Sequence, residues 1–115
     1  MSKWSKFLKA EFCGPVIRIN NSLEFIKLQR LAKTNKLEGW KQLCKYSYLE
    51  ILHILYLNYR GKDWNKDTDN NKSFLVENSY RGGFTFATLN EHNEHRQSPD
   101  EWEIVPMTEI LNELK

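Results

Sequence analysis

Apolar side chains recur at helical spacing in NNSLEFIKLQRLAKTN, residues 20–35. Four of them share one face of the expected helix and form a stripe for burial: Phe25, Leu28, Leu31 and Ala32. Asn21 or Ser22 is a suitable N-cap, and Glu24 follows Asn21 by three residues, as in a capping box. The pattern predicts a helix that begins at Asn21 or Ser22 and packs one face into the core.

A second, more apolar segment is YSYLEILHILYLNYRG, residues 46–61. It is apolar on nearly all sides and rich in leucine, which favours a helix over a strand and predicts the central helix of the core. Ser47 is a suitable N-cap and Gly61 a suitable stop. His53, inside this segment, is expected to be a core histidine with a satisfied ring nitrogen. Shorter helices are expected over residues 2–12 and 37–46.

Short β-branched or alternating stretches predict strands at residues 15–19, 73–77, 83–88 and 102–105. Phe84 and Phe86 illustrate the alternation, because polar or small residues separate them. Pro106 is expected to end the last strand, and a short amphipathic helix is expected from Thr108 onward. The elements together predict an α+β fold, in which a helical N-terminal half packs on a small, mostly antiparallel β-sheet and a short C-terminal helix follows.

The length and composition predict one globular domain that spans residues 1–115. Hydrophobic residues make up 40% of the chain and charged residues 28%, a balance that argues against global disorder. The aromatic share of 13% favours a compact fold with aromatic side chains to spare for an interface. The polar stretch GKDWNKDTDNNKS, residues 61–73, is expected to be the loop that joins the two halves.

Charge is distributed unevenly along the chain, although the net charge is only +2. Residues 1–62 hold 12 of the 17 Lys and Arg residues but four of the 15 Asp and Glu residues. This basic half makes a nucleic-acid-binding module an alternative function, with lysines and arginines in contact with phosphates. The basic residues expected to contact phosphates in that case are Lys3, Lys6, Lys9, Lys27, Arg30, Lys33, Lys36, Lys41 and Lys45.

The compartment is expected to be the cytoplasm. Cys13 and Cys44 lack a CxxC spacing and fit small core hydrophobes in a reducing compartment, although a single disulfide between them stays open. The start MSKWSKFLKAEF has no long apolar run and is not typical of a secretory signal. No apolar stretch has the length of a transmembrane segment.

The polar stretch LNEHNEHRQSPDEW, residues 89–102, carries two of the three histidines. Glu91, His92 and His95 are residue types that bind zinc or manganese, which leaves a small metal-dependent hydrolase as a second alternative. A closed metal site requires further ligands, however, and HxxH spacing is common by chance. The stretch is therefore interpreted as a polar loop that contacts a partner, with no metal and no cofactor.

Two other motifs are interpreted as structural. DTDNN, residues 67–71, begins like a calcium-binding loop, but Lys72 stands where such a loop needs glycine and Asn78 where it needs glutamate. SYRGGFTFAT, residues 79–88, has the composition of an RNA-binding strand without its order, and fits a hairpin turn over core phenylalanines. No phosphate-binding loop or nucleophile motif is present, so an enzyme is not expected.

The leading hypothesis is a small intracellular protein that acts by stoichiometric association with a macromolecular partner, which is expected to be a protein. Small, signal-less chains rich in lysine and asparagine are typical of phage and mobile-element products, including inhibitors of host defence or toxin proteins. The expected contact residues are aromatic and charged side chains outside the core: Trp64, Tyr80, Arg81, His92, His95, Arg96 and Trp102.

Overall fold

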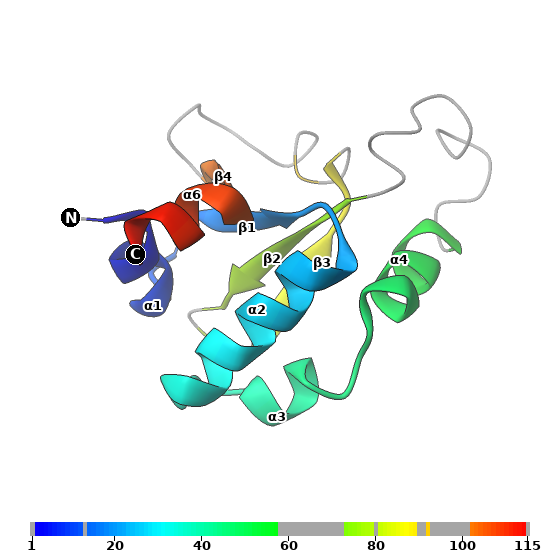
Figure 1. Cartoon of the computed structure of the whole chain (residues 1–115), viewed down its shortest axis with the longest axis horizontal. Coiled ribbons are helices and arrows are strands. Elements are labelled where there is room, and N and C mark those ends of the chain that lie inside the picture. The colour runs from blue at the N-terminus through cyan, green and yellow to red at the C-terminus, as the bar shows by residue number, and fades with distance from the viewer. Residues whose placement is uncertain are drawn as a thin grey trace.

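The computed structural model describes residues 2–12, 14–57, 73–79, 81–89, 92 and 102–114 (Figure 1). In chain order its elements are α1 (Lys3–Leu8), β1 (Val16–Ile19), α2 (Ser22–Thr34), α3 (Trp40–Leu43), α4 (Tyr48–Leu57), β2 (Phe74–Asn78), β3 (Phe84–Ala87), β4 (Ile104–Pro106) and α6 (Met107–Glu113). The fold is α+β, as the sequence predicts. None of the helices in the described ranges is long and apolar enough to cross a lipid bilayer.

The four strands form one sheet in the order β3-β2-β1-β4. The β2–β3 and β1–β2 pairs are antiparallel, whereas β4 lies parallel to β1 at the edge. The prediction of a mostly antiparallel sheet is therefore confirmed. The last strand begins two residues later than predicted and includes Pro106 as its final residue, so α6 starts at Met107 rather than at Thr108. Pro106 is tolerated there because it ends an edge strand and precedes the first turn of a helix.

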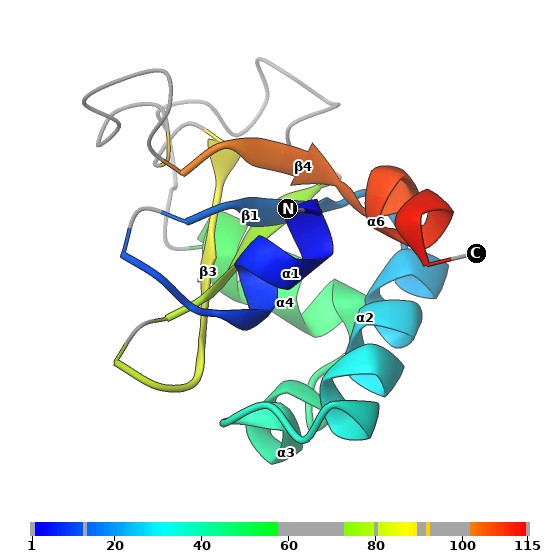
Figure 2. The same ribbon diagram turned by 90° about the vertical axis from the view of Figure 1, so that its left-hand side faces the viewer.

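The two faces of the sheet differ in what covers them. Successive side chains of a strand point to opposite faces, and the register places Ile17 beside Val76 on the face that receives the helices. Helix α2 crosses this inner face, and α1 and α6 lie side by side at one end of it (Figures 1 and 2). Val16, Leu75 and Glu77 belong to the opposite, outer face.

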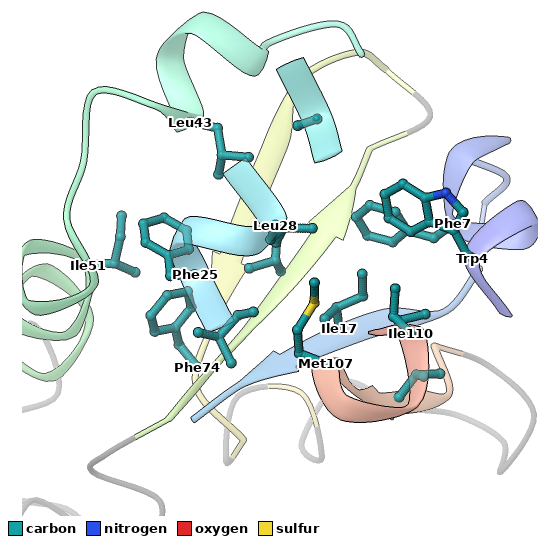
Figure 3. Close-up of a cluster of buried hydrophobic side chains, with 14 residues drawn as sticks. Trp4, Phe7, Ile17, Phe25, Leu28, Leu43, Ile51, Phe74, Met107 and Ile110 are labelled. Carbon is teal, nitrogen blue, oxygen red and sulfur yellow. The ribbon is translucent and has the colours of Figure 1, made fainter. Parts of the chain in front are cut away.

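One cluster of buried side chains joins the inner face of the sheet to the helices (Figure 3). It runs from Trp4 and Phe7 on α1, past Ile17 on β1, to Phe25 on α2 and Phe74 on β2. Because residues from both halves of the sequence are buried in it, neither half completes this core alone.

Helix α2 begins as predicted. The side chain of Asn21 accepts a hydrogen bond from the backbone N–H of Glu24 (2.9 Å), and the Glu24 carboxylate accepts one from the N–H of Asn20 (2.9 Å). Phe25, Leu28 and Ala32 of the predicted stripe are fully buried, and Leu31 is partly buried against the core. The capping box and the buried face are both confirmed.

Helix α4 contradicts its prediction as the central core helix. Eight of its ten residues are apolar or aromatic, yet it lies at the periphery of the fold beside α2 (Figure 1). Ile51 is buried, whereas Leu49 is 71% exposed and Ile54 is also exposed. The predicted N-cap is confirmed, because Ser47 Oγ accepts a hydrogen bond from the Glu50 N–H (3.1 Å).

Two polar residues near α4 also differ from their predictions. His53 is exposed, so its prediction as a core histidine is wrong. Cys44 is an exposed free thiol rather than a core hydrophobe, and its Sγ lies 3.7 Å from the Gln29 carbonyl oxygen. Both follow from the peripheral position of this part of the chain. Cys13 and Gly61 lie outside the described residues.

The N-terminal helix is held by the C-terminal one. Helix α1 is shorter than the predicted 2–12, and its backbone N–H groups at Lys3 and Trp4 donate to the two carboxylate oxygens of Glu113 (both 3.0 Å). A carboxylate is favourable there because the first N–H groups of a helix lack intrahelical acceptors. The Lys3 ammonium forms an ion pair with Glu103, and this hydrogen bond raises the pKa of Lys3.

Helix α3 approaches the β2–β3 turn through two glycines. Gly39, which precedes α3, has φ +86°, and Gly83 in the turn has φ +84°. A Cβ atom on Gly39 would lie 2.7 Å from the Gly83 Cα, closer than real contacts allow. Glycine is therefore required at position 39 both by the backbone angle and by the neighbouring chain.

Candidate functional site

A cavity of about 160 Å³ opens on the outer face of the sheet, opposite the helices. Its walls come from β1, β2 and β3, from a residue that follows β3 and from a residue that precedes β4. The lining residues are Val16, Leu75, Glu77, Thr85, Ala87, His92 and Trp102. Val16 and Leu75 are buried although they point away from the core, so the outer face is covered at these two positions, whereas Thr85 on the same face is exposed.

Glu77 is the acidic group of the cavity. It stands opposite Thr85 in the β2–β3 ladder, and both side chains point to the outer face. Burial raises the pKa of the Glu77 carboxyl group, and a hydrogen bond with Thr85 opposes part of that rise. The desolvation dominates because the surrounding walls are largely apolar.

Trp102 is the aromatic group of the cavity and has an unusual backbone conformation. Its φ is +49°, in the left-handed region that bulky residues rarely adopt. Its indole Nε1 atom is buried and has no hydrogen-bond partner among the residues that the structure describes. Phe12 contacts the indole edge-on, with ring centroids 5.6 Å apart. The Trp102 side chain as a whole is half-buried, although its Nε1 atom is fully buried.

His92 also lines the cavity. Its exposed fraction is 9%, and its backbone N–H donates to the Thr88 carbonyl oxygen (3.1 Å). The His92 side chain is therefore buried against the outer face of the sheet rather than exposed to solvent. The described part of the chain contains no group of three or more His, Cys, Asp or Glu side chains able to hold a metal ion. Glu91 and His95 lie outside it.

The raised pKa of Glu77 predicts a pH-dependent stability. The folded protein binds more protons than the unfolded chain between the ordinary glutamate pKa, about 4.3, and the raised one, so stability falls as pH rises through this interval. Glu77→Gln cannot ionise, and we expect its free energy of unfolding, relative to the wild type, to increase across the same interval. Urea unfolding at several pH values measures this difference.

The exposed Glu11→Gln variant is the control for that measurement, since it removes an unburied carboxylate from the same chain. The Glu77→Gln difference is compared with the Glu11→Gln difference at each pH, which corrects for the loss of one carboxylate charge. A Glu77→Gln difference that stays flat or declines as pH rises would show that the desolvation of Glu77 is unimportant. His92, a titratable group that also lines the cavity, is unchanged in both variants.

A second candidate surface lies on the helical side. We define the apolar helix surface as the exposed large apolar residues of α2, α4 and the α3–α4 connection: Leu23, Ile26, Tyr46, Leu49 and Ile54. The Gln29 side-chain amide holds α2 against the α3–α4 connection. Its Nε2 donates to the carbonyl oxygens of Leu43 (2.9 Å) and Tyr46 (2.7 Å). Tyr48 Oη donates to the Asn20 carbonyl oxygen (3.1 Å) and ties the start of α4 to the start of α2.

Basic side chains are exposed on α2 and α3, on the helical side of the fold. Arg30 and Lys33 are exposed on α2, and Lys41 is exposed on α3. Lys33 and Lys41 both lie over the Trp40 ring, with Nζ 5.9 Å and 5.8 Å from its centroid. Cation–π contacts of this kind hold the ammonium groups at defined positions on the surface.

The structure brings together two of the residues predicted from sequence, His92 and Trp102, in the outer cavity. Arg81 lies elsewhere, exposed in the β2–β3 turn, where its backbone N–H donates to Ser79 Oγ (3.2 Å). The other predicted contact residues lie outside the described residues: Trp64, Tyr80, His95 and Arg96. The stretch that begins like a calcium-binding loop, residues 67–71, also lies outside them.

Sequence reasoning missed Glu77 as a site residue and missed the apolar helix surface. The alternation in SFLVE offers a signal for Glu77, because its position two residues after Leu75 places both on one face. No comparable signal marks Leu49.

Comparison of the chain with protein-family models, curated proteins and solved structures finds no match.

Proposed function

We propose that this protein binds a protein partner through the apolar helix surface and acts by occupying it, without catalysis. The observation that carries the proposal is the exposure of Leu49 and Ile54 on α4, the most apolar of the described helices. Exposed apolar side chains on neighbouring helices, rimmed by polar groups, are typical of interaction sites.

The surrounding charge indicates the chemistry of the partner. Arg30, Lys33 and Lys41 are exposed on α2 and α3, so a complementary partner presents an apolar patch together with acidic side chains. Inhibitors that neutralise another protein by one-to-one association fit this requirement. An acidic partner also accounts for the clustering of lysine in the helical half of the chain.

Leu49→Glu is expected to weaken partner binding at least tenfold, because it places a charge where an apolar contact forms and repels an acidic rim. Leu114→Glu is the matched control, since Leu114 is an exposed leucine at the end of α6, outside the apolar helix surface. The partner is isolated from the native host by affinity purification, purified, and titrated with each variant by calorimetry.

Three results would contradict the proposal. Equal loss in Leu49→Glu and Leu114→Glu, or loss in neither, would show that the apolar helix surface is not the contact. Recovery of nucleic acid, removed by nuclease and released steeply by salt, would favour the nucleic-acid alternative. A homodimer in light scattering that Leu49→Glu converts to monomer would identify a second copy as the occupant.

A further inference from the structure

The sheet ends at β3 with one side of this strand unpaired. β3 stands first in the order β3-β2-β1-β4, and among the described strands only β2 pairs with it. An edge strand presents a row of backbone N–H and C=O groups with which another strand can pair. The free edge of β3 is therefore a candidate surface for an added strand.

Phe84 and Phe86 carry the unpaired backbone groups of β3. The Ser79 N–H donates to the Gly83 carbonyl oxygen (2.9 Å), so this pair is hydrogen-bonded across the β2–β3 ladder. Hydrogen-bonded and non-hydrogen-bonded pairs alternate along an antiparallel ladder. The backbone groups of Thr85 therefore point towards β2, and those of Phe84 and Phe86 point away from it. Within the described residues, no hydrogen bond reaches the N–H or C=O of Phe84 or Phe86.

A groove of about 310 Å³ lies beside this edge. Gly83, Phe84 and Phe86 line it on the sheet side. Its helical side is formed by residues at α3 and in the α3–α4 connection: Gly39, Gln42, Leu43 and Tyr46. The volume is about twice that of an engineered apolar cavity, about 150 Å³, that holds benzene. The groove therefore takes one large apolar side chain of a strand bound to β3.

The segment that forms the helical side of the groove carries exposed lysines. Lys41 and Lys45 are exposed on either side of Gln42 in the sequence. The carboxylate of Glu38, in the same segment, lies at the β2–β3 turn, where a Cβ atom on Gly82 would be 2.8 Å from it. The lysines are thus complemented by an acidic side chain on the bound segment.

We propose that β3 and the groove bind an extended, acidic peptide segment of another protein. The segment pairs with Phe84 and Phe86 as an added strand and places one apolar side chain in the groove. In this mode of recognition main-chain hydrogen bonds supply affinity, and pockets for alternate side chains supply specificity. Leu49 and Ile54 do not line the groove, so the site goes beyond the proposed function and does not depend on it.

A display library of random heptapeptides, selected against the full chain, supplies the probe. We expect the enriched peptides to combine β-forming residues, one large apolar side chain and at least one aspartate or glutamate. The most enriched peptide is synthesised and titrated into the ¹³C,¹⁵N-labelled chain. A library that yields no enriched peptide, or one enriched in basic peptides, overturns the proposal.

Hydrogen exchange of the backbone amides reports strand pairing directly. In the complex the N–H groups of Phe84 and Phe86 are expected to exchange about tenfold more slowly, because they become donors in a ladder. The Thr85 N–H is the internal control, since it already points towards β2, and we expect it to change less. Equal slowing at all three residues would indicate general stabilisation without pairing and contradict the proposal.

N-methylation of the peptide removes its N–H groups one at a time. Successive N–H groups of a strand point to opposite edges, so only alternate ones face β3. Methylation of those is expected to weaken binding about tenfold, and methylation of the others is expected to leave it nearly unchanged. Binding that does not follow this alternation would show that the peptide is not held as a strand.

Gln42→Trp tests the groove, because Gln42 is an exposed lining residue and an indole there fills the space. We expect peptide binding to weaken about tenfold. Asn112→Trp is the matched control, since Asn112 is an exposed amide on α6, and it is expected to leave binding unchanged. Equal affinities of the two variants would contradict insertion in the groove. The dispersion of each ¹⁵N spectrum separates a loss of binding from a loss of structure.

Two further results distinguish this site from the apolar helix surface and from self-association. Leu49→Glu is expected to bind the peptide as the wild type does. Peptide binding that is lost in Leu49→Glu and kept in Gln42→Trp would place the peptide on the apolar helix surface, which overturns this site and supports the proposed function. A homodimer in light scattering that Gln42→Trp dissociates would identify a second copy as the added strand and also overturn the proposal.

Discussion

Replacing Phe74 by alanine is expected to lower the free energy of unfolding by about 3–5 kcal/mol, the range for a large aromatic side chain removed from a core. Phe74 is fully buried at the start of β2. Its ring lies 5.3 Å from Phe25 on α2, 5.9 Å from Phe86 on β3 and 5.7 Å from Tyr48 on α4, measured between centroids. The substitution therefore removes contacts to three elements at once.

Urea denaturation measures this effect as a lower midpoint with an unchanged slope. Leu49→Ala is the control, because Leu49 is large and apolar but exposed, and we expect a change of at most about 0.5 kcal/mol there. Native domains are stable by only about 5–15 kcal/mol, so Phe74→Ala removes a large part of the total. A loss below about 1.5 kcal/mol would contradict the packing around Phe74.

Gly39→Ala is expected to destabilise the protein more than Gly83→Ala, although both glycines have nearly the same positive φ. The left-handed conformation costs an L-residue about 1–2 kcal/mol at either position. Only at Gly39 does the added Cβ meet backbone, 2.7 Å from the Gly83 Cα, whereas a Cβ on Gly83 meets nothing within 4 Å. We expect the contact to add roughly 1–3 kcal/mol, as overpacking usually does.

The pair is informative because the entropy that alanine removes from the unfolded chain is similar in both variants and cancels in the difference. Thermal and urea unfolding of the two variants, side by side, measure that difference. Equal stabilities would show that α3 does not approach the β2–β3 turn as closely as described. A less stable Gly83→Ala would reverse the assignment of the close contact.

Local chemistry made α2 and its cap predictable from the sequence. The hydrogen bonds of Asn21 and Glu24 lie within one helical turn, and the spacing of Phe25 and Leu28 reports directly which face is buried. The alternation of Phe84 and Phe86 likewise identified a strand whose phenylalanines pack against the core. Interactions among near neighbours in sequence are readable without the tertiary structure.

The exposure of α4 and the composition of the outer cavity depend on distant residues. An apolar run such as YLEILHILYL fits a buried helix and an interface helix equally well, because periodicity alone does not show what lies opposite each face. The cavity joins Glu77, His92 and Trp102 only through the strand order and the return of the chain to β4. Neither fact follows from local spacing.

The parallel pairing of β1 with β4 has a consequence for synthesis on the ribosome. Val16 pairs with Ile104, and Met107 and Ile110 are fully buried in the core, so the sheet edge and this part of the interior form only after residue 110 has left the exit tunnel. Until then the nascent chain exposes Ile17 and Phe25 to other macromolecules. Folding of this core therefore waits for residues 104–110, and a nascent chain that lacks them is a natural client for chaperones that recognise apolar segments.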